Sequence, residues 1–313
     1  MIIREKPCIT TLSEGNDGLS AALSSWMFSM CLAGLGYQTI LIQTDTSPIQ
    51  FDPDTGIRHQ LTQHLHATCM PTLQTLVLPI ENTSNRNQQF ESFIRSIRTL
   101  PAEYIIMDLG TAKTEFDHIA MAFADIPVYL MTDEPASVIK AYHLIRSTLL
   151  TKLKFYIDDT EVYQRFQQCG VLRDGPFLNT LSNCMEKLKD IDPWIHDKIQ
   201  KCKTDFSPHT VVLNNTVQYD YQQLLCSAVQ EYLDLSLNCW GSMCDKSHWG
   251  QPARMTFNSS LARYNSKVVS MVIRHILAET SESVSHGRYH KDTFRHIFTH
   301  DNTVKHHEMI SLN

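Results

Sequence analysis

This 313-residue chain lacks three features, and each absence excludes a type of protein. Its nine cysteines are an odd number and contain no C-x-x-C pair, which predicts reduced thiols of a cytoplasmic protein rather than a disulfide framework. It has no excess of positive charge, since the formal net charge is -6, and this argues against nucleic acid as a partner. Its start, Met-Ile-Ile-Arg-Glu-Lys, is too short and too charged for a signal peptide, so none is expected.

Charge is also absent from a long internal stretch, Gly18 to Thr44. Gly34 and Gly36 interrupt this stretch near its middle. We therefore expect a buried helix of about 15 residues followed by a buried strand, Gln38–Gln43, and no membrane span.

The residues around this helix have the order of a phosphate-binding βαβ unit. Pro7–Leu12 is a short β-prone run, and Gly15 and Gly18 mark a turn before a helix that opens at Ser20. In such a unit the backbone N–H groups of the loop and the helix N-terminus bind phosphate. A chance turn before a core helix is the alternative reading.

The loop resembles that of the MinD/ParA/FlhG-type P-loop ATPases, a family whose loop reads K-G-G-x-G-K-[ST] before an apolar helix. Here the corresponding residues read E-G-N-D-G-L-S, from Glu14 to Ser20. The resemblance implies a nucleotide site, for ATP or ADP with Mg²⁺, that includes Gly15, Asn16, Asp17, Gly18, Leu19 and Ser20.

Two departures from the family pattern remove positive charge. Leu19 stands where the phosphate-binding lysine belongs, and Glu14 stands where the family has its signature lysine. Opposite charges about 4 Å apart are worth roughly 4 kcal/mol at an effective dielectric near 20, and one lost donor costs roughly 10²–10³ in rate. The sequence thus predicts weakened or lost nucleotide binding and little turnover. Asp17 or Glu14 is also a candidate internal cap of the helix.

Two further segments match the family in the expected order. The apolar strand Glu103–Asp108, with Gly110 two residues on, resembles the one that delivers an acid to Mg²⁺, which implies a metal site at Ser20, Asp45 and Asp108. The strand and helix within Ile126–Ile145 match the sequence pattern of the family most closely. We expect Ser137 to cap this helix, and its sheet-facing residues to be Ala141, Leu144 and Ile145.

Near the C-terminal half, Thr210–Asn215 resembles the family's strand whose asparagine contacts adenine. Asn214 is the better aligned candidate for nucleotide binding, and a plain turn explains the same residues. A helix at Tyr219–Leu233, a strand within Leu237–Asp245 and a terminal helix at Asn258–Leu277 complete the predicted domain.

Between the Glu14–Ser20 loop and Glu103 we expect one more α/β unit. It consists of a helix near Gly56–His66, a strand at Thr72–Leu78 and an amphipathic helix at Asn85–Leu100. The apolar face of this last helix is formed by Phe90, Phe93, Ile94 and Ile97.

The predicted organisation is one α/β domain over residues 1–278 with a helical insertion at about 153–207, and a polar tail at 279–313. The insertion is expected to form three helices, Asp159–Cys169, Asn179–Ile191 and Pro193–Cys202, which suit either a partner contact or a cap over the sheet. The tail carries six of the fifteen histidines, and either a metal site or a polar tail explains them. Its short apolar patch, which includes Phe294, Ile297 and Phe298, gives weak support to membrane contact.

The fold class predicted is a doubly wound, mostly parallel α/β sheet flanked by helices. Three functions are compatible with it. The first is a non-catalytic or very weakly catalytic relative of MinD, ParA and FlhG that binds protein partners, or a second copy of itself, to position or regulate a bacterial surface, motility or division apparatus. The second is an active ATPase whose cations come from elsewhere, such as Arg146, Lys152 or Lys154. The third is an unrelated α/β ligand-binding domain.

Overall fold

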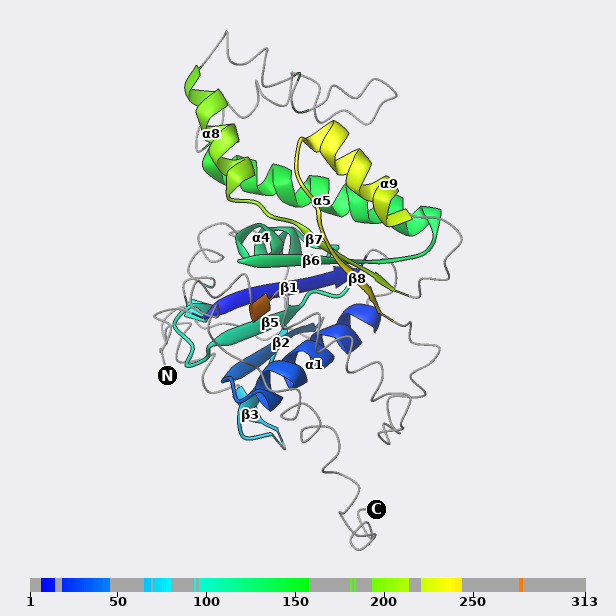
Figure 1. The fold of residues 1–313 in the computed structure, drawn as a ribbon. Coiled ribbons are helices and arrows are strands. Elements are labelled where there is room, and N and C mark those ends of the chain that lie inside the picture. The colour runs from blue at the N-terminus through cyan, green and yellow to red at the C-terminus, as the bar shows by residue number, and fades with distance from the viewer. Residues whose placement is uncertain are drawn as a thin grey trace, which may run out of the picture.

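A computed structural model describes residues 7–14, 19–45, 65–68, 70–79, 93, 96–157, 181, 183, 193–213, 221–243 and 276–277. Its centre is an eight-stranded sheet of order β3-β4-β2-β5-β1-β6-β7-β8 (Figure 1). The strands are β1 (Cys8–Glu14), β2 (Thr39–Asp45), β3 (Leu65–Ala67), β4 (Leu73–Pro79), β5 (Tyr104–Asp108), β6 (Ile126–Thr132), β7 (His209–Leu213) and β8 (Asn238–Met243). Every pairing is parallel except that of β3 with β4. The predicted mostly parallel α/β sheet is confirmed.

The helices divide between the two faces of the sheet (Figure 1). Helix α1 (Leu19–Gly34) packs against β1, β2 and β5 on one face. On the other face lie α4 (Glu115–Phe123), α5 (Pro135–Tyr156), α8 (Pro193–Thr204) and α9 (Tyr221–Ala228), which continues as the π-helix η2 (Val229–Leu233). No described helix is long and apolar enough to cross a membrane.

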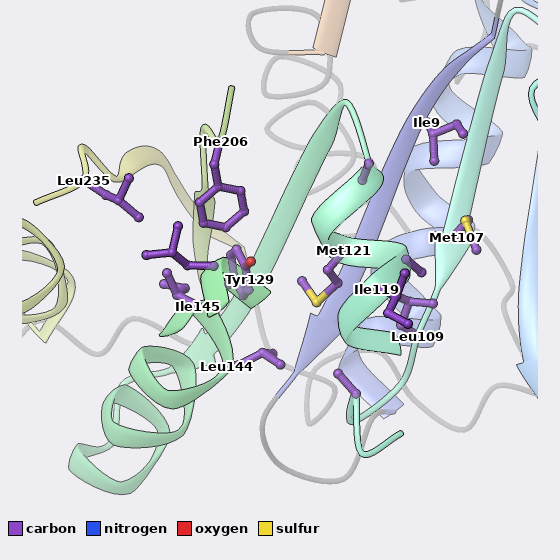
Figure 2. Close-up of a cluster of buried hydrophobic side chains, with 14 of the residues drawn as sticks. Ile9, Met107, Leu109, Ile119, Met121, Tyr129, Leu144, Ile145, Phe206 and Leu235 are labelled. Carbon is purple, nitrogen blue, oxygen red and sulfur yellow. The ribbon is translucent and has the colours of Figure 1, made fainter. Parts of the chain in front are cut away.

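Two apolar cores follow from this division, because successive side chains of a strand point to opposite faces. Figure 2 shows the core on the α4 and α5 side. Ile119 of α4 lies toward Met107 of β5, and Ile145 of α5 lies near Tyr129 of β6. The core on the α1 side holds alternate residues of β1 and β5, Cys8, Leu12, Tyr104 and Ile106, together with Phe28 of α1. The central strand β1 is buried over all seven residues.

The uncharged stretch folds as expected. Helix α1 has 16 residues and no acidic or basic residue in its terminal turns, and it lies over the sheet with Phe28 and Leu32 fully buried. Gly36 follows it at φ 92°, a conformation that L-residues rarely adopt, and the chain then enters β2. The prediction of a buried helix and strand is confirmed.

Other helices are confirmed where the structure describes them. Phe93 and Ile97 of the predicted helix Asn85–Leu100 are buried, whereas Phe90 and Ile94 lie outside the described residues. Helix α8 covers the predicted Pro193–Cys202. The predicted helix Asp159–Cys169 lies outside the described residues. The same holds for Asn179–Ile191 apart from Leu181 and Asn183, which are helical, and for Asn258–Leu277 apart from the buried pair Ile276 and Leu277.

Two local predictions are wrong. The C-terminal end of the helix expected at Gly56–His66 is instead strand, because Leu65 and His66 pair with Leu76 and Thr75 across a tight turn at the sheet edge. Ser137 does not cap α5, whose N-cap residue is Glu134. The Ser137 hydroxyl lies inside the first turn and accepts a hydrogen bond from the Thr132 N–H at 2.9 Å, so it fixes the connection between β6 and α5.

The edge strand β8 contains a bulge. Cys239 pairs with Thr210 and Gly241 pairs with Val211, so Trp240 is the extra residue of β8. Its side chain is 6% exposed and packs in the α1-side core, with its ring centroid 6.3 Å from that of Phe28. The bulge therefore connects the sheet edge to α1.

This packing generates a stability prediction. Phe28→Ala removes a fully buried ring between α1 and β8 and is expected to lower the free energy of unfolding by about 3–5 kcal/mol. Ile139→Ala on α5 is the control, because its side chain is 58% exposed and its loss should cost under about 0.5 kcal/mol. Urea unfolding of both variants measures the difference, and equal losses would contradict the described core.

Candidate functional site

The candidate site lies where β1 and β5 end side by side. These strands are parallel neighbours, with Leu12 paired to Asp108. After β1 the chain turns to α1 on one face, and after β5 it turns to α4 on the other. In open α/β sheets a ligand site is expected at such a switch point, outside the carboxyl ends of the strands.

Gly110 holds the two strand ends together. Its carbonyl accepts hydrogen bonds from the Glu14 N–H at 2.9 Å and from the Ser13 hydroxyl at 3.1 Å. Its own N–H donates to Oδ1 of Asp108 at 3.0 Å. The φ of Gly110 is 54°, a conformation that favours glycine. These hydrogen bonds require that conformation, so they also favour glycine at this position.

Asp108 is held in a nearly water-free position, with 7% of the residue exposed. Burial raises the pKa of Asp108 from 3.8 to about 6, the hydrogen bond from Gly110 opposes this rise, and the charge of Asp117 adds to it. The carbonyl of Asp108 also accepts a hydrogen bond from the Thr44 hydroxyl of β2 at 3.0 Å. Asp108 is therefore a carboxyl group positioned by the ends of β1, β2 and β5.

Asp117 brings a second buried carboxyl group to the same loop. It forms a capping box with Thr114, whose N–H and hydroxyl donate to Oδ2 of Asp117 at 2.8 and 2.7 Å, while the Asp117 N–H donates back to the Thr114 hydroxyl. Burial raises the pKa of Asp117, and these hydrogen bonds oppose the rise. The box begins α4 and orders the segment that follows Asp108.

Glu14 is the third buried acid, at 2% exposed, and it is the last residue of β1. Its register partner in β6 is Leu130, which lies in the α1-side core, so Glu14 is placed on the α1 face of the sheet. The carboxyl edge therefore presents Glu14, Asp108 and Asp117. Lys113, in the loop between β5 and α4, is exposed.

Several predicted site residues occupy the expected elements. Asp108 ends β5, Asp45 ends β2, and Leu19 and Ser20 are the first residues of α1. Backbone positions alone are described for Asp45, Leu19 and Ser20. The loop residues Gly15, Asn16, Asp17 and Gly18, and the predicted adenine contact Asn214, lie outside the described residues. The gap at 15–18 is nevertheless bounded by β1 and α1, as a phosphate-binding loop requires.

The predicted magnesium site stays a prediction. Within the described residues no three His, Cys, Asp or Glu side chains form a group that could hold a metal ion. Two members of the predicted set, Ser20 and Asp45, have no described side chain. Asp108 is the one member whose carboxyl position is known, and a carboxylate is a ligand type that Mg²⁺ accepts.

The cations considered for an active enzyme are engaged elsewhere. Lys152 donates to the carbonyl of Asp205 and lies over the Phe206 ring, 5.5 Å from its centroid. These residues immediately precede β7, at the amino edge of the sheet, opposite to the β1–α1 loop. Lys154 lies 4.0 Å from Glu115, and Arg146 is buried on α5.

The burial of Glu14 and the capping box of Asp117 are not predicted from the sequence. Glu14 was placed in the loop, but it belongs to the buried strand. Asp117 was not singled out, although the pattern Thr114-x-x-Asp117 before an apolar run is a recognisable capping box.

No protein-family model matches the sequence, and no curated protein matches it. Solved structures do match. The MinD cell division protein of Aquifex aeolicus is 13% identical, with 86% of this chain and 96% of that chain covered and a TM-score of 0.45. A ParA family ATPase from Chlorobium tepidum is 11% identical (86% and 99% covered, TM-score 0.47). The septum site-determining protein MinD of Pyrococcus horikoshii, in complex with Mg-ADP, is 10% identical (87% and 98% covered, TM-score 0.48). These proteins belong to the group that the sequence motifs resemble.

The burial of Asp108 generates a pH prediction. Since the pKa is raised from 3.8 to about 6, folding favours the protonated form, and stability is lost as the pH rises between these values. Asp108→Asn removes the ionisation and keeps an acceptor for Gly110. It should raise the free energy of unfolding by on the order of 3 kcal/mol at pH 7 and change it little at pH 4.

Urea unfolding at the two pH values measures this difference. Asp197→Asn on α8 is the control, because the side chain of Asp197 is 85% exposed, and it should show no such pH dependence. A gain for Asp108→Asn that is equal at pH 4 and pH 7 would contradict the buried carboxyl group.

The conformation of Gly110 generates a further prediction. A Cβ at this position meets nothing within 4 Å, so Gly110→Ala is strained through its φ of 54° alone. We expect a loss of about 1–2 kcal/mol in the free energy of unfolding, and a smaller loss for Gly110→Asn, because Asn tolerates this region better. Thermal unfolding of both variants checks the order. Equal losses would contradict a conformational origin of the cost.

Proposed function

We propose that this chain is a non-catalytic or very weakly catalytic protein of the MinD/ParA/FlhG type. It acts by binding protein partners to position or regulate a bacterial surface, motility or division apparatus. The observation that carries the proposal is the buried acid Glu14 at the end of β1, beside the β1–α1 connection, with Leu19 as the first residue of α1. A strand end followed by a helix start, as a phosphate site requires, is present there, and Glu14 brings an acidic side chain in place of a basic one.

The balance of charge supports loss of catalysis. A nucleotide phosphate at the end of β1 approaches two carboxyl groups, of which Asp108 is mostly ionised at pH 7 because its pKa is about 6. A like-charge contact about 4 Å away costs roughly 4 kcal/mol at an effective dielectric near 20, a penalty that a bound cation offsets only in part. Leu19 at the first position of α1 supplies no positive charge.

Any nucleotide site is therefore proposed as weak or lost. If ATP or ADP binds with Mg²⁺, the backbone of Gly15–Ser20 and the N-terminus of α1 would hold the phosphates, and Asp108 and Asp45 would face the metal. Asn214 would contact the adenine. The ligand would then stabilise a conformation rather than undergo hydrolysis.

Exposed apolar side chains support binding of a protein partner, or of a second copy of the chain, in the cytoplasm. Ile139 on α5 is 58% exposed, Leu224 on α9 is 56% exposed and Trp194 on α8 is 50% exposed. All three helices lie on the face of the sheet opposite to α1, and α8 and α9 both contact α5. A partner that covers these side chains would bury apolar surface without contact with the β1–α1 loop.

A charge-restoration experiment tests the proposal. Glu14→Gln with Leu19→Lys removes a buried acid and adds the missing lysine, so the affinity for Mg-ATP should rise at least tenfold over that of the wild type. Gln is chosen at position 14 because a lysine there would be buried. Thermal shift against nucleotide concentration measures the affinity, since ligand at 100 times its Kd stabilises the folded state by about 2.7 kcal/mol.

Asp197→Lys is the matched control, because it changes the net charge by the same two units at an exposed site on α8. A gain limited to the restored variant supports the proposal. Tight Mg-ATP binding by the wild type, with steady phosphate release that Asp108→Ala abolishes, would replace it with an active ATPase. An unchanged affinity in the restored variant would favour an unrelated α/β domain.

A further inference from the structure

Two cysteines far from the candidate site lie in contact. Cys226 on α9 and Cys239 on β8 have their sulfur atoms 2.9 Å apart. Cys226 is half-buried and Cys239 is exposed, so both are within reach of a small-molecule oxidant. Cys31 and Cys202 differ sharply, because both are buried and burial raises the pKa of each thiol to about 12.

The two elements that carry these thiols are held in place by their surroundings. Helix α9 packs on α5, and β8 pairs with β7. The connection between them turns at Asp234, in the left-handed region with φ 52°, where Lys203 of α8 forms a salt bridge to its carboxylate. The two sulfurs are thus brought together by the fold, and a bond of about 2.05 Å requires only a small further approach.

We propose that Cys226 and Cys239 form a reversible disulfide that joins α9 to the edge strand β8. The oxidant is a low-molecular-weight disulfide of the glutathione type. A thiolate of the pair attacks one sulfur of the oxidant, which releases one glutathione thiolate and leaves a mixed disulfide. The second thiol loses its proton and attacks the protein sulfur, which releases the second glutathione. Two electrons and two protons pass to the oxidant, and one protein disulfide forms.

The disulfide closes a short loop that contains η2 and the turn at Asp234. Such a cross-link stabilises the folded state mainly by restricting the unfolded chain. It fixes α9, which carries the exposed Leu224, against the sheet edge. The state of the pair therefore sets the rigidity of one end of the helical face.

The experiment oxidises the full chain with glutathione disulfide, blocks the remaining thiols with iodoacetamide and maps the peptides. Glu-C is the suitable protease because Glu231 lies between the two cysteines, whereas trypsin finds no Lys or Arg between them. Cys69, Cys169, Cys184 and Cys244 are replaced by serine in the background, so that Cys239 is the sole cysteine of its Glu-C peptide.

The expected product is a peptide pair linked through Cys226 and Cys239, with two hydrogen atoms lost, while Cys31 and Cys202 remain reduced. The oxidised chain should unfold about 5 °C above the reduced one, and dithiothreitol should reverse this shift. Cys226→Ser should instead retain glutathione on Cys239, because no second thiol displaces it.

Three outcomes would overturn the proposal. They are a background variant, with Cys226 and Cys239 both present, that stops at the mixed disulfide, a disulfide between Cys239 residues of two chains, and a linked peptide pair without any change in the melting temperature. The Cys226→Ser and Cys239→Ser variants should match the reduced parent in melting temperature. This agreement shows that the shift comes from the cross-link and not from the loss of a thiol.

Discussion

Strand β1 is buried on both faces and paired on both edges, so the backbone groups at its carboxyl end have to form their hydrogen bonds within the protein. This constraint explains the arrangement around Gly110. The loop after β5 turns back through a left-handed glycine, its carbonyl binds the end of β1, and its N–H binds Asp108. A change in any of these groups alters the local geometry at the ends of two central strands.

The same constraint gives the acids at this edge their properties. Asp108 and Asp117 lie where water is scarce, so their ionisation opposes folding, and hydrogen bonds from Gly110 and Thr114 return part of that cost. A buried acid costs folding free energy that an apolar residue would not, so its presence suggests that the protein uses the charge. In the proposed function the acids exclude phosphate or hold a cation, and either role depends on their burial.

Much of this architecture is predictable from the sequence. Buried parallel strands give uninterrupted apolar runs, so β2, β5, β6 and β7 are recognised directly, and α1 is recognised by a lack of charge that only a covered helix tolerates. Asp108 is predictable because it ends an apolar strand. The short strand β3 is not, because its three residues are set by pairing with β4 and not by any pattern of their own. The depth of Glu14 is missed for a related reason, since it depends on β1 continuing two residues beyond its apolar run.

The bulge at Trp240 also affects how copies of this protein could meet. A regular edge strand offers an even row of N–H and C=O groups that another chain can extend, whereas an extra residue twists this row and offsets its spacing. The indole that the bulge turns inward anchors β8 to α1, which resists straightening of the strand. Growth of the sheet from one molecule into the next is thereby disfavoured on the β8 side.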